Sequence, residues 1–289
     1  MAYVRVTDAN GGAIVFSTHH ENLLDNGWFT VNQLGVTSKT TSSGTVARFI
    51  DRWAVSRYSS GSQVFQWSDA GLTITPTVTS FLDQYYSRPL ADGDGVTLGI
   101  LMSDGTIYSR YTTVGAGLVN VNGADIKCRV NETYLRIQFS SSWAGGTIRA
   151  IKLERGRPCT LADDTFPDYA TELLKCQRYL YVVQPMGSNT EAAVGFASNN
   201  GTGGQFNIGV SVPAAMAKVP TVSFSGGTYA NFYVNVQGVD YACTAAPTIS
   251  TMSSPNLPVV VGTFNTTSKV FSLAYMKNSG VLILSAEDY

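Results

Sequence analysis

The chain has 289 residues, of which 44% are hydrophobic and only 13% are charged, and its formal net charge is −1. This length exceeds one ordinary core and predicts two modest domains, while the low charge predicts a surface rich in neutral polar side chains. No run of basic residues suits nucleic-acid phosphates and no apolar run reaches membrane-spanning length, so we expect neither a nucleic-acid partner nor insertion into a membrane.

Residues 1–20 are predicted to form a short N-terminal segment that precedes the first domain. The segment lacks a basic start followed by a long apolar core, so it does not resemble a signal peptide. His19 and His20 are adjacent and would point to opposite faces of a strand, which makes them a poor metal-binding pair. We therefore expect no metal site here.

Residues 21–155 alternate apolar and polar side chains over short runs, and Gly-rich turns separate the runs. One run places Phe49, Trp53 and Val55 on one face, and another places Leu135, Ile137 and Phe139 on one face. A period of two with short turns is typical of an antiparallel sandwich.

Residues 156–180 are predicted to be a linker that contains one short helix. The sequence "ERGRPCTLADDTFP" has two prolines and no alternation, and Asp168 is a plausible N-cap of the helix that follows. Tyr169, Leu173 and Cys176 are expected to share one helical face, with Glu172 and Lys175 on the other. A helix this short must dock its apolar face, either on the N-terminal sandwich or on symmetry copies around an axis.

Residues 181–289 are again β-like and predict a C-terminal β-sandwich. In "NFYVNVQ", Phe232, Val234 and Val236 face one way, and the residues between them face the other way. The whole chain is therefore predicted to be all-β.

The four cysteines are scattered and predict reduced, partly buried thiols of a protein made in a cytoplasm. A disulfide between two of them is the alternative. The residues concerned are Cys128, Cys159, Cys176 and Cys243, and the alternative pair is Cys159–Cys176.

Three stretches resemble phage tail-fibre and related virion proteins. "IKLERGRPCT" followed by "PDYATELLKCQRYLY" resembles their strand, linker and short Glu-Leu-x-x-Cys-Gln-Arg-Tyr helix. "NLLDNGWFTVNQLG" followed by "DRWAV" resembles the opening of the module that often precedes this signature. "VSVPAAMAKVPTVSFSG" and "LILSAEDY" resemble the C-terminal β domain of the same proteins.

The resemblance implies a fibre or spike protein of the virion, assembled in the host cytoplasm and forming a homotrimer. The module over residues 21–155 would be a jelly-roll similar to carbohydrate-binding modules, and residues 1–20 would attach to other virion proteins. Arg178 and Tyr179 would fix the exit of the helix into the second domain.

Sugar-binding sites stack sugar rings on exposed aromatic side chains and hold hydroxyl groups with polar ones. Tyr85 and Tyr86 cannot both face inward from a strand, and Trp143 lies in the turn-like "SSWAGG". We take these three as candidates for contact with a host cell-surface glycan. Since no basic cluster is apparent in the sequence, we expect a neutral or weakly charged ligand.

The sequence offers no motif for catalysis, and we expect neither an enzyme nor a cofactor. Nothing in the sequence places two carboxylates together as glycoside cleavage requires, and the "DGDG" at Asp92–Gly95 lacks the closing Glu of a calcium loop and predicts a turn. A purely structural virion protein, such as a head fibre, decoration protein or baseplate adaptor, is the alternative to a receptor-binding fibre. A capsule-degrading enzyme is a third hypothesis.

Overall fold

The structure is a computed structural model that describes residues 3–7, 13–17, 20–41, 46–58, 60–185, 190–199, 204–225, 229–266, 271–277 and 280–287. It confirms the predicted all-β class, since nearly every regular element is an antiparallel strand. The chain divides into two compact units, Met1–Glu172 and Leu173–Asp288. The division falls inside the predicted linker, 156–180.

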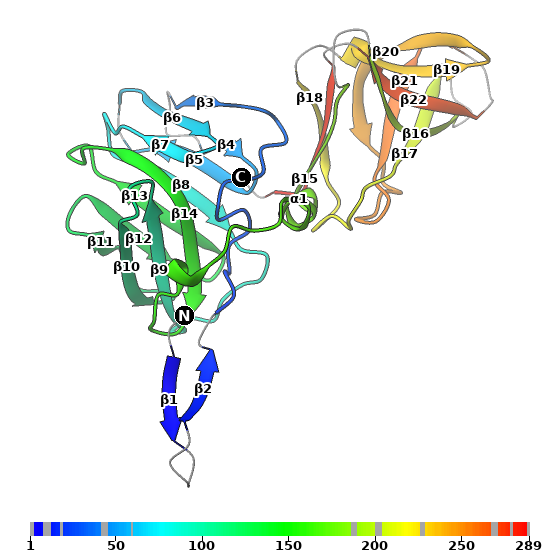
Figure 1. Cartoon of the computed structure of the whole chain (residues 1–289). Coiled ribbons are helices and arrows are strands. Elements are labelled where there is room, and N and C mark those ends of the chain that lie inside the picture. Colours follow the sequence, from blue (N-terminus) through cyan, green and yellow to red (C-terminus); the bar gives the residue numbers. More distant parts are fainter. Residues whose placement is uncertain are drawn as a thin grey trace. The chain divides into compact units, whose positions relative to one another are not determined.

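The first unit is an antiparallel jelly-roll sandwich of two six-stranded sheets (Figure 1). The chain passes repeatedly from one sheet to the other, so consecutive strands are often in different layers. One sheet has the order β10 (Ile107–Thr113), β9 (Gly95–Met102), β14 (Gly146–Arg155), β7 (Gly71–Ile74), β6 (Gln63–Ser68) and β3 (Ser38–Thr41). The other has the order β11 (Val119–Asn122), β12 (Ile126–Val130), β13 (Tyr134–Phe139), β8 (Ser80–Tyr85), β5 (Trp53–Arg57) and β4 (Ala47–Ile50).

The core of this unit lies between the two sheets and consists of the predicted inward positions. Phe49, Trp53 and Val55 are buried there, as the alternation predicts. Leu135, Ile137 and Phe139 of β13 are also buried in it, while the residues between them lie on the outer face. On β13, alternation therefore fixes which face meets water.

Of the predicted N-terminal segment, the structure describes an antiparallel hairpin of β1 (Tyr3–Thr7) and β2 (Ala13–Ser17), and His20. The other positions of residues 1–20, His19 among them, lie outside the described residues.

The second unit contains a small three-stranded sheet and a closed six-stranded barrel. The sequence predicts a sandwich for this unit, and the structure specifies a closed barrel with a small sheet. Strands with one inward face can form either arrangement. Bulges in β16 and β20 supply the bends that closure requires. The small sheet has the order β15 (Leu180–Val183), β23 (Val281–Ser285) and β18 (Thr221–Ser225), and the barrel runs β16 (Glu191–Asn199), β17 (Gln205–Val210), β21 (Val259–Phe264), β20 (Val239–Ile249), β19 (Phe232–Val236) and β22 (Ser272–Lys277).

The predicted orientation of β19 is confirmed. Phe232, Val234 and Val236 are buried in the barrel core, whereas Tyr233 and Asn235 are half-buried on the outside. Three short helical elements complete the described chain: η1 (Leu161–Asp163), α1 (Tyr169–Gln177) and η2 (Tyr229–Asn231).

Candidate ligand-binding site

The outer face of the β12–β13–β8 region presents aromatic and basic side chains from adjoining strands. On β13, Tyr134 and Arg136 lie on the outer face because their neighbours in sequence fill the core. The register places Tyr134 opposite Tyr85 of β8, and Arg136 opposite Arg129 of β12. We call this surface the outer strip and define it by Tyr85, Lys127, Arg129, Tyr134 and Arg136.

Two half-buried tyrosines form one end of the outer strip. The ring centroids of Tyr85 and Tyr134 are 5.6 Å apart, and their planes are tilted by 41°. The backbone at Tyr85 is held because its carbonyl oxygen accepts a hydrogen bond from the buried guanidinium of Arg52. A fixed pair of partly exposed rings is a surface on which a sugar ring can pack.

Arg136 is fixed in the middle of the outer strip by a two-point ion pair. Its Nε and Nη2 atoms donate to Oδ1 and Oδ2 of Asp83, each at 2.8 Å. The guanidinium carbon also lies 4.7 Å from the ring centroid of Phe81 and 5.8 Å from that of Tyr134. The Arg136 side chain remains 32% exposed, so part of this oriented cation faces solvent.

The pKa values of the ion pair show opposing effects of burial and charge. Burial raises the pKa of Asp83 above its ordinary value, although the hydrogen bonds and positive charge of Arg136 act to lower it. The same hydrogen bonds raise the pKa of Arg136. The geometry is that of an ionised pair, and the positive charge of Arg136 offsets the free-energy cost of burying the Asp83 carboxylate.

Two further cations adjoin Arg136. Arg129 is exposed on β12, and Lys127, two residues before it, is half-buried on the same outer face. Neither makes an ion pair within the part of the chain that the structure describes. The expectation that no basic cluster exists is therefore wrong, because the sheet assembles charges from positions that do not form a run in the sequence.

Trp143 is buried, and Tyr86 is half-buried with its hydroxyl group turned inside. Trp143 is only 7% exposed and stacks on Phe139 with a centroid distance of 5.2 Å. Tyr86 packs partly against the core, and its hydroxyl is buried without a hydrogen-bond partner among the described residues. Burial raises the pKa of Tyr86. Of the three predicted glycan-contact residues, Tyr85 alone belongs to the outer strip.

The predicted apolar stripe of the helix α1 is not buried within the chain at its first position. Tyr169 is 54% exposed and Leu173 is only half-buried, whereas Cys176 is fully buried. The buried side of the helix instead runs through Glu172, Cys176 and Tyr179. Glu172 lies on the face opposite the predicted stripe and is nevertheless buried, because it has a specific partner.

That partner is the backbone amide of Asn26, which donates to the Glu172 carboxylate at 2.9 Å. Asn26 adopts φ 52°, a conformation that Asn tolerates better than most residues. Its side-chain oxygen accepts from the amide of Val31, and its carbonyl accepts from Nε1 of Trp53 at 3.0 Å. The "NGWF" and "DRW" stretches therefore form a buried network of hydrogen bonds around Asn26 in the first unit.

The two ends of α1 are held by different contacts. At its start the Asp168 carboxylate accepts from the amide and hydroxyl of Thr171, each at 2.8 Å, as the predicted N-cap requires. These hydrogen bonds lower the pKa of Asp168. After its end the carbonyl of exposed Arg178 accepts from Ala217, and that of Tyr179 accepts from Ala286, both at 2.7 Å within the second unit.

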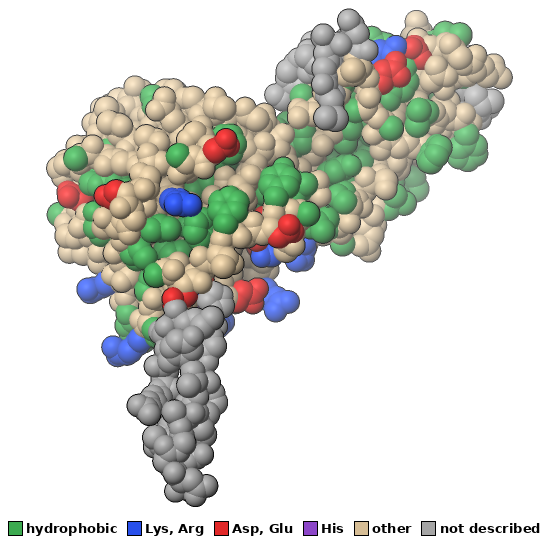
Figure 2. All heavy atoms as spheres, viewed as in Figure 1, with side chains coloured by type: hydrophobic (Ala, Val, Ile, Leu, Met, Phe, Trp, Pro, Cys, Tyr) green, Lys and Arg blue, Asp and Glu red, His purple; other side chains and the backbone are tan. Residues whose placement is uncertain are grey.

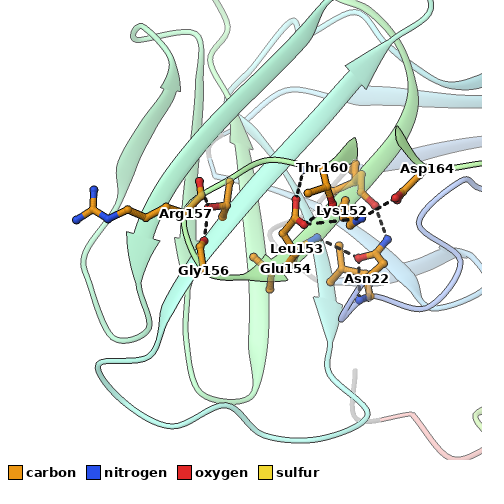
Figure 3. Close-up of polar contacts among 11 residues, drawn as sticks. Asn22, Lys152, Leu153, Glu154, Gly156, Arg157, Thr160 and Asp164 are labelled. Carbon is orange, nitrogen blue, oxygen red and sulfur yellow. Dashed lines mark hydrogen bonds and ion pairs between the residues drawn. The ribbon is translucent and has the colours of Figure 1, made fainter. Parts of the chain in front are cut away.

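A buried polar cluster holds the start of the predicted linker against the first unit (Figure 3). Lys152 and Glu154 point from β14 to the same side of the sheet, and both are fully buried. Nζ of Lys152 donates to Thr160 at 2.8 Å and to Asp164 at 2.6 Å. The Glu154 carboxylate accepts from the amide and hydroxyl of Thr160, each at 2.6 Å.

These contacts change the interpretation of two sequence features. Residues 156–164 are packed on the sandwich by the Lys-Leu-Glu strand and are no open linker. All four cysteines are free thiols, which excludes the alternative Cys159–Cys176 disulfide in this structure. Burial raises the pKa of the Cys128 thiol to about 12, as expected for an unreactive core residue.

Several other sequence predictions can be located. Residues 92–93 form a turn, with the Asp94 amide donating to the Ala91 carbonyl at 3.1 Å. Within the described ranges, no three His, Cys, Asp or Glu side chains gather where they could hold a metal ion. None of the helices described is long and apolar enough to cross a membrane.

The barrel carries a second aromatic pair, but a cation covers it. Tyr233 and Tyr275 stack with a centroid distance of 5.9 Å, and Nζ of Lys277 lies 5.1 and 5.4 Å from the two rings. Lys277 also donates to Asp240, and this contact lowers the pKa of Asp240 to about 2. The outer strip of the first unit is therefore the better candidate for contact with a sugar.

Comparison with known proteins adds no assignment. Neither the protein-family models nor the curated proteins contain a match to this chain. The function must therefore be argued from the site itself and from the resemblance of its motifs.

Proposed function

We propose that the protein is a virion fibre or spike of the phage tail-fibre type, whose jelly-roll unit binds a host cell-surface glycan without cleaving it. The proposal rests on the outer strip, where Tyr85 and Tyr134 offer ring faces beside the oriented donors of Arg136. The sequence motifs that resemble fibre proteins support the same assignment. Charged side chains are few on the surface seen in Figure 2, which also suits contact with sugar hydroxyl groups.

Binding at one such site is expected to be weak. One stacked ring and a few hydrogen bonds give a Kd near millimolar, or roughly 4 kcal/mol. Three copies in a fibre and several fibres on a particle would raise the avidity by about 10²–10⁴. Multivalent binding would thus hold a particle on a host cell although each single site binds weakly.

The test is adsorption of particles that carry the Tyr85→Ala/Tyr134→Ala variant. Adsorption to host cells should fall while thermal stability and assembly persist, because both side chains are partly exposed. The control is Tyr169→Ala, which removes an exposed tyrosine that lies outside the outer strip. Unchanged adsorption of the double variant would exclude the outer strip as the receptor site.

A purely structural virion protein is a second candidate, and the barrel surface favours it. Phe196 of β16 is 77% exposed and lies opposite Leu273 of β22, and Phe271 is 84% exposed two residues before Leu273. Exposed apolar patches of this kind mark protein contacts. The same surface supports the proposed homotrimer, and residues 1–20 would attach the chain to other virion proteins.

A further inference from the structure

The outer strip carries more positive charge than a neutral sugar requires. Arg129 lies directly opposite Arg136, and Lys127 lies opposite the neighbouring Gln138. Side chains opposite each other in an antiparallel pair have Cβ atoms about 4.5–5.5 Å apart, and like charges there repel. Asp83 neutralises Arg136, but Arg129 and Lys127 have no anionic partner among the described residues. A bound anion would relieve this repulsion.

We propose that the ligand of the outer strip is a carboxylated glycan, that is, a sugar chain bearing uronic or sialic acid groups. This inference rests on the proposed function and specifies its ligand. Tyr85 and Tyr134 would pack against a sugar ring, and Arg129 with Lys127 would hold the carboxylate. A guanidinium suits this task because its parallel N–H groups match the two oxygens of a carboxylate.

The charge distribution favours a sugar acid over a nucleic acid. The chain as a whole is slightly acidic, with a formal net charge of −1, so it has no general attraction for polyanions. The positive charge of the outer strip is confined to three side chains on two adjacent strands. Such a site matches one or two carboxylates beside a ring rather than a continuous phosphate backbone.

The experiment uses the full-length protein and an array on which each carboxylated glycan stands beside its neutral counterpart. Single-stranded DNA and a sulfated polysaccharide are included as polyanions without carboxylates. The test variant is Lys127→Gln/Arg129→Gln. The matched control is Lys39→Gln/Arg149→Gln, which removes the same charge from β3 and β14 of the other sheet.

We expect the wild-type protein to bind carboxylated glycans in preference to their neutral counterparts, and to bind more weakly as salt increases. The test variant should lose about tenfold or more of this affinity, equivalent to one charge-assisted contact, and the control should keep it. The salt titration of the wild-type protein also tests the proposal if the variant fails to fold.

Other outcomes separate the inference from the proposed function. Equal binding to neutral counterparts, or an unchanged affinity of the test variant, would overturn the carboxylate assignment and leave glycan binding intact. Equal binding to DNA or the sulfated polymer would also overturn it, because charge alone would then suffice. Absence of binding to every glycan would instead refute the proposed function.

Discussion

At the scale of single residues, Arg136 combines a structural and a binding role. It holds the buried Asp83 carboxylate through two hydrogen bonds, and its exposed side belongs to the outer strip. A buried carboxylate without a cation costs several kcal/mol, so any substitution of Arg136 affects folding as well as binding. The two effects differ in their dependence on pH.

The variant Arg136→Gln should lower the free energy of unfolding by about 2–3 kcal/mol at neutral pH, less than for a fully buried pair because Arg136 is partly exposed. The folded-state pKa of Asp83 is already raised. A carboxyl with a raised pKa takes up a proton more readily when folded, so its burial cost falls as pH drops through that pKa. Urea denaturation should therefore show a smaller deficit at about pH 5 than at about pH 7.

The double variant Asp83→Asn/Arg136→Gln provides the control for this prediction. It contains no buried charge at position 83, so its stability relative to the wild-type protein should not show the same recovery in acid. A deficit of Arg136→Gln that is equal at both pH values would show that Asp83 is not the titrating group.

At the scale of elements, the strand β14 and the segment after it form one polar assembly. Lys152→Met would leave Glu154 buried without its cation and would remove the ion pair to Asp164. Breaking a buried pair in this way costs about 3–5 kcal/mol. Urea denaturation should show this loss, and proteolysis should cleave residues 156–168 faster than in the wild-type protein. Lys39→Met, on the polar strand β3, should change neither result.

The helix α1 permits a prediction of its own. Glu172→Leu removes the acceptor of the Asn26 amide and should cost about 1–3 kcal/mol, because a buried donor is left unsatisfied. Glu172→Gln retains an acceptor oxygen and should cost less. Leu174→Gln, at an exposed position of the same helix, is the control for thermal denaturation. Equal stability of Glu172→Leu and Leu174→Gln would contradict the assigned role of Glu172.

At the scale of the whole molecule, the exposed apolar side chains of the barrel predict self-association. Light scattering of the purified protein should give three times the 30.9 kDa mass of the chain. Phe196→Ser/Phe271→Ser should shift the mass towards that of the monomer, because both side chains are exposed on the barrel. Tyr58→Ser removes an equally exposed aromatic residue from the first unit and should leave the mass unchanged. A wild-type mass of one chain at all concentrations would exclude the trimer.

Alternation along the strands was sufficient to predict much of the fold but little of the site. Phe49, Trp53 and Phe232 lie in the cores as predicted, since a period of two decides the inward face whatever the partner strand. The outer strip depends on which strands are neighbours, and no single segment contains that information. Trp143 was misassigned because a turn-like sequence does not reveal that its ring stacks on Phe139.

The position of the division between the units has a consequence for recombination. A chimera that combines one unit of this chain with a unit of another chain needs a crossover point at which both products still fold. A crossover after Arg155 would separate Glu154 from the Thr160 with which it shares two hydrogen bonds. A crossover after Glu172 would keep this cluster and the Asn26 contact in one parental sequence. Hybrid chains joined at Leu173 should therefore be recovered more readily than hybrids joined at the end of β14.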